Sequence, residues 1–240
     1  MKKVRKSLRF DPQLTRAERL WQDWRGFFLF IAVMLVFRSA IADWNQVPSG
    51  SMIPSILVGD RIVVDKLAYD LRIPFTLQRI FGWHDPERGD VVTFPSPMDE
   101  RLLVKRIIGL PGDEVELRRN RLIINGIAAD YRELQPSEFS DAMNGLKSNR
   151  FVEESVLGSS RVIMLQRYPH GSAHMSFPKQ QVPADHYLVM GDNRDNSSDF
   201  RVIGFVSRER ILGRAEAIAF SLDYDNYYRP RLDRFFEELP

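Results

Sequence analysis

The chain has 240 residues, of which 44% are hydrophobic and 28% charged, so it can bury a sizeable core and is not a disordered protein. It contains no cysteine, which excludes disulfides, thiolate nucleophiles and cysteine-based zinc sites. The net charge is only +2, but the first 25 residues carry eight Lys and Arg against three Asp and Glu. The basic excess is therefore confined to the N-terminus.

An apolar helix is predicted directly after this basic segment. The run GFFLFIAVMLVF, residues 26–37, is uncharged, and Thr15 with Glu18 fits a capping box that would start a helix near Arg16. The run alone spans only about 18 Å as a helix, short of the roughly 30 Å hydrocarbon core of a bilayer. Its flanks must therefore contribute if the helix is to cross a membrane.

The flanking residues favour such a crossing. If the helix continues past Ala42, Trp24 and Trp44 lie about 30 Å apart, which suits aromatic belts at two opposite interfaces. Arg38 would then extend its long side chain toward the headgroups. We predict one transmembrane helix, with residues 1–44 forming a basic cytoplasmic tail and an anchor.

The charge of the N-terminus predicts the orientation of this anchor. Positive residues stay in the cytoplasm, so residues 45–240 would form an extracytoplasmic domain. A cleavable secretory signal has a similar pattern, and a mature N-terminus at Asp43 would identify one. The long basic segment and the interruption by Arg38 favour an uncleaved anchor. Because no nucleic-acid-binding motif accompanies the basic residues, no nucleic acid is predicted as a partner.

After residue 44 the sequence has the pattern of a β-rich domain. Short β-branched apolar runs alternate with Gly, Pro, Asn and Asp, and Asn125-Gly126 is a tight-turn signal. No helical pattern of comparable length alternates with these runs, which argues against a parallel α/β fold. The predicted strands lie at residues 61–64, 90–94, 102–110, 114–117, 121–125, 161–165, 186–190 and 217–220.

Two segments depart from this strand pattern. Residues 127–160 are polar and poorly periodic, which indicates a variable insertion. The tail RLDRFFEELP has the helical spacing i, i+3, i+4, i+7 and predicts a short amphipathic helix docked on the domain. The apolar residues with that spacing are Leu232, Phe235, Phe236 and Leu239.

PSGSM, residues 48–52, is a candidate nucleophile segment. Pro, Ser and Gly form turns for ordinary backbone reasons, so a serine such as Ser51 becomes a nucleophile only if a base lies beside it. A histidine is one possible base, but nothing in the sequence selects one, and solvated loop histidines are the simpler interpretation. The histidines are His84, His170, His174 and His186.

Lys105, in LLVKRIIGL, is a second possible base. Strand alternation places it on the same face as Leu103 and Ile107, where an amine loses its water. Desolvation lowers a lysine pKa from about 10.4 toward neutrality, so that the amine can accept a proton from a serine hydroxyl. The alternative is an edge-strand lysine that reaches water. Lys66 is the next candidate, although Asp65 gives it a more polar setting.

A third polar segment, residues 189–205, contains three aspartates that suggest calcium. The EF-hand spacing fails, because Arg194 stands where an acidic ligand is needed and Ser197 stands where glycine is needed. No metal or other cofactor is therefore predicted. Arginines in the segment would instead neutralise the carboxylates and hold the loop rigid, although an ordinary surface loop remains an alternative. The charged residues concerned are Asp192, Asp195, Asp199, Arg194 and Arg201.

In combination, three segments resemble the bacterial type I signal peptidases, membrane-anchored serine proteases that cut signal peptides from exported proteins. The segments are PSGSMIPSILVGD, then RGDVVTFPSP with LLVKRIIGLPGD, and then MGDNRDNSSDFRVIGFV, and the resemblance covers residues from about 25 to 220. It implies that Ser51 is the nucleophile, Lys105 the general base and Ser49 an oxyanion-hole donor. It also implies that Ser197 orients the lysine and that four residues give structural support, namely Arg106, Asp192, Asp199 and Arg201.

The resemblance further implies a mainly β fold, a largely antiparallel catalytic domain of two sheets preceded by one transmembrane helix. The expected activity is removal of signal peptides after small residues of the Ala-X-Ala type through an acyl-enzyme. The expected partners are secretory preproteins and the lipid bilayer, with the domain on the outer, periplasmic side of the bacterial inner membrane. The short single anchor and Leu103, where relatives can have an aromatic residue, depart from the family pattern.

Two other classes of protein remain compatible with the sequence. A self-cleaving repressor-type protease shares the Ser-Lys chemistry but would carry a DNA-binding module in place of the anchor. A membrane-tethered binding domain would use the same β scaffold with an inert Ser51. Cleavage of a secretory precursor distinguishes both from a signal peptidase.

Overall fold

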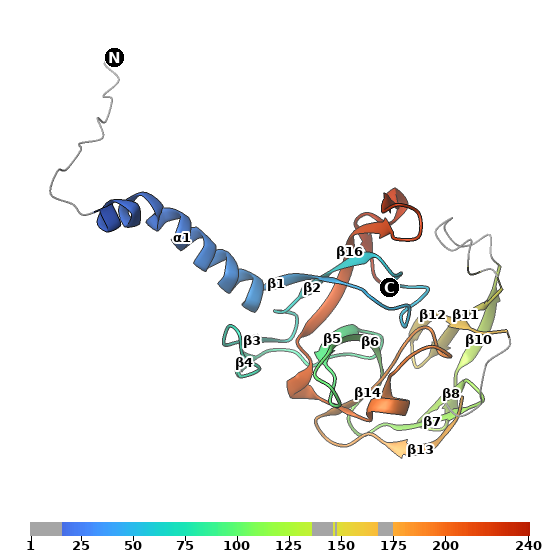
Figure 1. Cartoon of the computed structure of the whole chain (residues 1–240). Helices are drawn as coiled ribbons and strands as arrows, with labels where there is room; N and C mark the ends of the chain where they lie inside the picture. The colour runs from blue at the N-terminus through green and yellow to red at the C-terminus, as the bar shows by residue number, and fades with distance from the viewer. Residues whose placement is uncertain (1–15, 136–145, 147, 168–174) are drawn as a thin grey trace, which may run out of the picture.

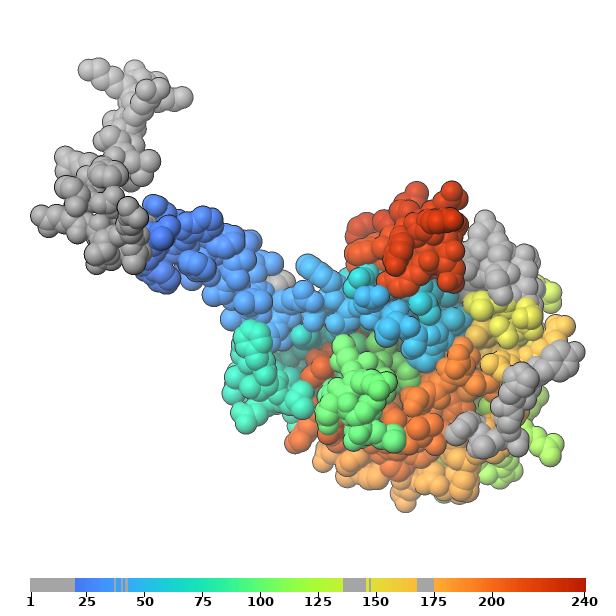
Figure 2. Space-filling view, viewed as in Figure 1, coloured from blue at the N-terminus to red at the C-terminus, as the bar shows by residue number. Residues whose placement is uncertain are grey.

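The computed structural model describes residues 16–135, 146, 148–167 and 175–240. One long helix, α1 (Arg16–Ala40), leads into a β-rich body in which all paired strands are antiparallel (Figure 1). α1 projects away from this body and contacts it only through its C-terminal end (Figure 2). The prediction of a mainly β, antiparallel fold is confirmed.

The largest sheet has the strand order β1-β2-β16-β5-β6-β14-β15, and two short strands pair with β16 near the C-terminus. β16 therefore separates the early strand β2 from β5, although it comes more than a hundred residues later in the chain. The strands of this sheet are β1 (Ala42–Gln46), β2 (Asp60–Asp65), β5 (Val91–Pro95), β6 (Leu102–Gly109), β14 (His186–Met190), β15 (Val206–Ser207), β16 (Gly213–Asp223), β17 (Arg229–Pro230) and β18 (Glu237–Glu238).

Three smaller sheets complete the described part of the chain. They have the orders β13-β7-β8-β9, β10-β11-β12 and β3-β4, so the expected two sheets are in fact four. Their strands are β3 (Asp70–Arg72), β4 (Arg79–Gly82), β7 (Glu114–Arg118), β8 (Arg121–Ile124), β9 (Ile127–Ala128), β10 (Asp130–Leu134), β11 (Arg150–Val156), β12 (Ser159–Leu165) and β13 (Phe177–Gln181). Most of these pairings join strands that are neighbours in sequence, whereas β13 pairs with β7 from much later in the chain.

Each of the eight apolar runs that predicted strands coincides with an observed strand, and three of them (90–94, 102–110 and 121–125) extend one residue beyond it. Asn125 and Gly126 connect β8 to β9 as a two-residue turn, and both adopt the positive φ angles that such a turn requires. Residues 127–160, expected to be an irregular insertion, also contain strands, and β10 and β11 pair with each other there. That segment is therefore more regular than its sequence pattern indicates.

The hydrophobic core lies on both faces of β6 and β14. Ile108 and Leu188 pack with β7 and β8, whereas Ile107 and Val189, one residue away on each strand, pack with β5. Strands that are buried on both faces have continuous rather than alternating apolar runs. This explains why the sequences of β6 and β14 are among the most apolar in the domain.

α1 spans Arg16–Ala40, so it does not continue past Ala42, and Thr15 of the expected capping box lies outside the described residues. The chain leaves the helix after Ala40, and Trp44 lies on β1, where it pairs with Val63 of β2. The prediction of two aromatic belts on one helix is therefore wrong, because strand pairing takes over the backbone of residues 42–46. Among the described residues, no helix is long and apolar enough to cross a membrane.

The C-terminal tail also differs from the prediction of an amphipathic helix. Residues 232–234 form a single 3-10 turn, and β18 then pairs with β16. Leu232 and Phe236 are 74% and 80% exposed, so they do not dock on the core. The buried residue of the turn is Arg234, which pairs with buried Asp60, whereas Leu239 does pack against the core.

Candidate active site

Ser51 lies in the turn-rich segment between β1 and β2, where buried Met52 and Ile56 hold the chain against the core. The backbone carbonyl of Ser51 accepts a hydrogen bond from the Asn193 N–H at 3.0 Å. The Asn193 side-chain amide donates to the carbonyl of Gly50 at 2.9 Å. The segment that carries Ser51 is therefore fixed from the side by the loop that follows β14.

Lys105 lies on β6, between β5 and β14, and its side chain is 2% exposed, which confirms the predicted burial. Its Nζ atom is 2.7 Å from Ser51 Oγ and also donates to the carbonyl of Val104 at 2.9 Å. Burial lowers the pKa of Lys105 from its ordinary 10.5 to about 8, although the carboxylates of Asp199 and Asp192 oppose this shift. The Ser51 hydroxyl is therefore hydrogen-bonded to an amine whose pKa lies close to neutral pH.

The two other serines suggested by the resemblance have different settings. Ser49 is exposed, and its hydroxyl makes no hydrogen bond to a described residue, so it is open to an incoming group. Ser197 Oγ is buried and has no hydrogen bond of ordinary geometry within the described residues. It lies close to Gly191, because a Cβ added there would meet Ser197 Oγ at 2.3 Å and the Ser51 carbonyl oxygen at 2.4 Å. Among the described residues, no hydrogen bond joins Ser197 to Lys105, whose Nζ atom bonds to Ser51 and Val104.

Asp192 and Arg106 form a fully buried ion pair behind the serine segment, with Arg106 Nη2 at 2.8 Å from Asp192 Oδ2. Ser55 donates its hydroxyl to the same carboxylate at 2.6 Å. Arg106 follows Lys105 on β6, and Ser55 follows Ser51 by one helical turn of chain. This ion pair therefore links β6, which carries Lys105, to the segment that carries Ser51.

Asp199 and Arg201 form a second buried ion pair, at 2.7 Å, around the short helix α2 (Phe200–Ile203). Asp199 caps α2 by accepting from the Arg201 N–H, and it also accepts from the Gly191 N–H at 3.0 Å. Burial alone would raise the pKa of Asp199, but Arg201 and the Gly191 N–H hold it below its ordinary value. The carboxylate therefore stays charged and fixes the loop beside Ser197.

Several residues of this site were not found from the sequence. Asn193 gave no signal beyond its polar loop, although it makes two hydrogen bonds to the serine segment. Glu154, on β11, is fully buried and pairs with Arg161 and Arg194, but its strand was not predicted. A charged residue inside a weakly apolar segment carries no local sign that its partners lie elsewhere in the chain.

The alternative bases lie away from Ser51. Among the described histidines, His84 is exposed, and His186 hydrogen-bonds through Nδ1 to the Ala184 carbonyl at 2.8 Å. His170 and His174 lie outside the described residues. Lys66 Nζ donates to the carbonyls of Arg38 and Ser39 at the end of α1. Lys105 is thus the described basic side chain that contacts the Ser51 hydroxyl.

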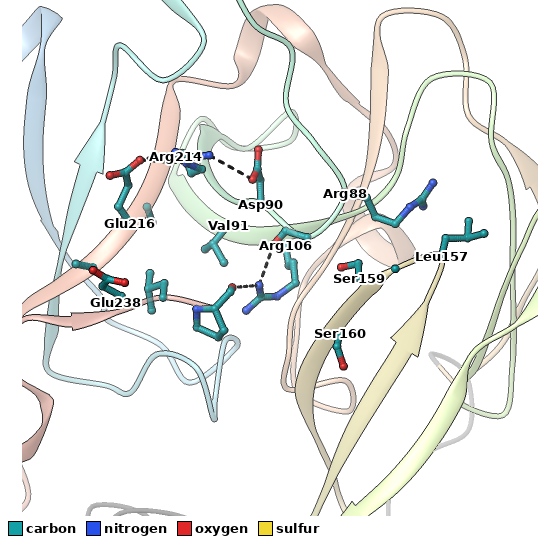
Figure 3. A pocket seen from close by; sticks show the side chains of 16 residues that line it. Arg88, Asp90, Val91, Arg106, Leu157, Ser159, Ser160, Arg214, Glu216 and Glu238 are labelled. Atoms are coloured by element: carbon teal, nitrogen blue, oxygen red, sulfur yellow. Dashed lines mark hydrogen bonds and ion pairs between the residues drawn. The ribbon is translucent and has the colours of Figure 1, made fainter.

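A cavity of about 680 Å³ lies between β16 and the turn that joins β11 to β12 (Figure 3). Glu216 and Glu238 lie on one side of it and Leu157 and Ser159 on the other, with Arg106 between them (Figure 3). Neither Ser51 nor Lys105 lines this cavity. The charge of Arg106, which lines the cavity, is already neutralised by Asp192. We therefore assign the cavity no part in the candidate site.

Comparison with known proteins gives a consistent result. The sequence profile of the family described as "Signal peptidase, peptidase S26" matches residues 21–220. A signal peptidase I of Pseudomonas fluorescens is 35% identical over 223 residues, which cover 87% of this chain and 75% of that protein. The signal peptidase I of Pseudomonas aeruginosa is 33% identical with the same coverage.

A crystal structure of a signal peptidase I from Enterococcus faecalis is also similar in sequence. It is 32% identical and covers 55% of this chain and 97% of that chain, with a TM-score of 0.33. That score is too low for a comparison of the two folds position by position.

Proposed function

The chain belongs to the signal peptidase family, peptidase S26, and from this premise we propose that it removes signal peptides from exported preproteins with Ser51 as nucleophile and Lys105 as base. Membership of the family makes it a serine peptidase. The observation that carries the proposed dyad is the 2.7 Å contact between Ser51 Oγ and the buried Lys105 Nζ. A hydroxyl becomes a nucleophile when a neutral base lies within hydrogen-bond reach.

In the first step, the neutral amine of Lys105 takes the proton of Ser51 Oγ while that oxygen attacks the scissile carbonyl carbon. The carbonyl oxygen becomes negatively charged, and the exposed Ser49 hydroxyl together with the Ser51 N–H would donate to it. Preorganised donors of this kind each contribute about 10²- to 10³-fold to the rate. Collapse of this intermediate breaks the peptide bond, and Lys105 passes its proton to the leaving nitrogen.

In the second step, Lys105 removes a proton from water, which attacks the acyl-enzyme. The bond to Ser51 Oγ breaks and the proton returns to that oxygen, so the enzyme is regenerated without a metal or cofactor in either step. Ser197 is proposed to orient the amine, supported by its position beside Gly191. The ion pairs Arg106–Asp192 and Arg201–Asp199 are proposed as structural supports of the two loops.

The proposed substrate is an extended segment of the preprotein that ends in a small residue such as alanine. An extended peptide can add to an exposed strand edge, where main-chain hydrogen bonds give affinity and pockets select alternate side chains. We propose cleavage of the Ala-X-Ala type for this chain. The role of residues 127–160 as a variable insertion is part of the same proposal, as is a division between anchor and catalytic domain near residue 44, drawn before β1 because that strand pairs with β2.

We further propose that α1 and its basic N-terminal flank anchor the chain in the bacterial inner membrane, with the catalytic domain on the outer side. The support is the ring of apolar side chains that α1 exposes, because such side chains are stable against lipid rather than water. At the end of α1, Arg38 pairs with Asp43 and stacks on Trp44, both groups suited to an interface. The exposed residues include Phe27, Phe28, Leu29, Phe30, Val33 and Leu35.

A cleavage assay tests the proposed function. The full chain is purified in detergent and incubated with a secretory precursor beside a Ser51→Ala variant, and products are identified by mass spectrometry. We expect a single cut after a small residue by the wild type only. An inert wild type would favour the tethered binding domain, and cutting only of its own chain would favour the self-cleaving protease.

A further inference from the structure

A buried ion cluster joins the strands of residues 127–165 to the loop that holds Ser51. Glu154 on β11 is fully buried, and its carboxylate is bound by two arginines and one tyrosine. Arg194 forms a fork, with Nη1 at 2.8 Å from Oε2 and Nη2 at 2.5 Å from Oε1. Arg161 donates to Oε1 from Nε at 2.9 Å, and Tyr131 donates its hydroxyl to Oε2 at 2.7 Å.

The two arginines and the one carboxylate give this cluster a formal charge of +1, which would become +2 without Glu154. Arg161 and Arg194 are both buried, and no other described carboxylate forms an ion pair with either of them. Within the described part of the chain, Arg161 Nη1 and Arg194 Nε already lack a hydrogen-bond partner. Burial alone would raise the pKa of Glu154, but the two arginines lower it to about 2, so its charge is present at any neutral pH.

The cluster reaches Ser51 through two consecutive residues. The Arg194 N–H donates to the Met164 carbonyl at 3.1 Å, and the Met164 N–H donates to the Asp192 carbonyl at 2.8 Å, so β12 fixes both ends of this short loop. Asn193, between those ends, makes the two hydrogen bonds to the Ser51 and Gly50 carbonyls. Glu154 thus holds the Arg194 side chain, and the preceding residue, Asn193, holds the backbone of the serine segment.

We propose that Glu154 is a positioning residue for Ser51, which acts through Arg194 and Asn193 to hold the Ser51 hydroxyl at its distance from Lys105. Glu154 forms no hydrogen bond with Ser51 or Lys105, and the proposed mechanism gives its strand, β11, no role. The inference rests on the proposed function, because positioning is measured by turnover. It predicts that the charge of Glu154 sets the rate of chemistry rather than the binding of substrate.

A double-mutant cycle tests this coupling. The variants are Glu154→Gln, which keeps the shape and removes the charge, Asn193→Ala, and the two combined. Glu153→Gln is the matched control, because Glu153 is the next residue on β11 but pairs with the exposed Arg132 instead. Each protein is assayed for kcat and KM on a precursor-derived peptide, and its folding is measured by thermal unfolding.

We expect Glu154→Gln to lower kcat about 10- to 100-fold with little change in KM, since small displacements of a reacting group cost that much. The double variant should be only as slow as the slower single variant, because both changes break the same connection. Glu153→Gln should keep the wild-type kcat. A folded Glu154→Gln protein with normal kcat, or two single losses that multiply in the double variant, would overturn the proposal.

A second pair of variants covers the case in which Glu154→Gln does not fold. Arg161→Met removes the arginine that does not belong to the loop and leaves the Glu154–Arg194 fork intact, so we expect its kcat to be unchanged even if its melting temperature shifts. Glu154→Asp keeps the charge but draws it back from Arg194, so its kcat should fall. Equal losses in both would contradict a route through Arg194. If the wild type and Glu153→Gln cut no precursor, the proposed function itself fails.

Discussion

Lys105 obtains its low pKa from burial rather than from a positive neighbour. The nearby carboxylates of Asp192 and Asp199 act in the opposite direction, so loss of water is the dominant cause. A group with this origin is sensitive to anything that admits solvent. In its proposed role as a base, Lys105 should therefore depend on how tightly the surrounding loops exclude water from it.

The first prediction concerns pH. A base must be unprotonated, so below about 8, the pKa of Lys105, the active fraction should fall about tenfold per pH unit. We expect kcat/KM on a short peptide to rise with pH and to level off above about 8. The profile is measured from acidic to alkaline buffers with folding checked at each end. A plateau already reached below pH 7 would indicate a histidine-like base instead.

Gly191 gives a second prediction at a single residue. A side chain there would meet the Ser51 carbonyl oxygen and Ser197 Oγ, both closer than ordinary contact allows. We expect Gly191→Ala to cost about 1–3 kcal/mol of folding free energy, as overpacking does, and to lower kcat by displacing Ser51. Urea unfolding and peptide cleavage measure the two effects.

Gly82→Ala is the matched control for that change. An added Cβ at Gly82 meets nothing closer than 3.9 Å, so its stability should stay within about 0.5 kcal/mol of wild type. Equal losses in the two variants would mean that the crowding around Gly191 is not the cause.

At the level of single residues, strand alternation placed Lys105 among apolar neighbours but left a lysine that reaches water as an alternative, and the structure shows it buried. It could not predict the contact with Ser51, because the two residues are 54 positions apart and no local pattern encodes that distance. The resemblance to a family supplied the pairing. Glu154 and Asn193 remained hidden because their role depends on partners that only the folded chain brings together.

Among the elements, the strands that were predicted are those with continuous apolar runs, and the strands that were missed are polar or short. β11 contains the two consecutive glutamates Glu153 and Glu154, and their polarity makes this stretch look like a loop in the hydrophobicity pattern. β1 was assigned to the preceding helix because Ala42 and Trp44 also suit a helix. In both cases tertiary pairing outweighed the local preference.

The C-terminal turn yields a prediction at this scale. Arg234 Nη2 binds the buried carboxylate of Asp60 at 2.8 Å and the Ser55 carbonyl at 3.0 Å, so the tail clamps the segment that follows Ser51. Arg234→Met leaves Asp60 buried without its counter-ion, which typically costs about 3–5 kcal/mol. We expect a lower urea midpoint and reduced cleavage.

The exposed Arg229 offers the control for the clamp. Arg229→Met should shift the urea midpoint little, because surface substitutions usually change stability by less than about 0.5 kcal/mol. If the two variants lost the same stability, the Arg234–Asp60 pair would not be responsible for holding the segment.

For the whole molecule, α1 and the β-rich body are joined by few contacts. Lys66 binds the last carbonyls of the helix, and the Phe75 N–H donates to Ser39 Oγ at 2.7 Å, so the contacts concentrate at the end of α1. A domain with its own core can fold without such an appendage. We expect a variant without residues 1–40 to fold and to cut a short peptide within about threefold of the full chain.

The same variant should process a membrane-inserted precursor poorly, because the proposed anchor no longer brings the two together. Circular dichroism and parallel assays on peptide and on precursor in vesicles make the comparison. Loss of peptide cleavage together with precursor cleavage would show that α1 supports the fold rather than its location.

The order of strands in the main sheet could not be predicted from the sequence, and it has a consequence for the order in which the sheet can assemble. β16 is inserted between β2, which follows Ser51, and β5, which pairs with the strand of Lys105. During synthesis, β16 (Gly213–Asp223) must therefore leave the ribosome before the two halves of the sheet can pair through it. If Ser51 and Lys105 act as proposed, we expect a nascent chain that lacks β16 not to bring them together, so cleavage should begin only when translation is nearly finished.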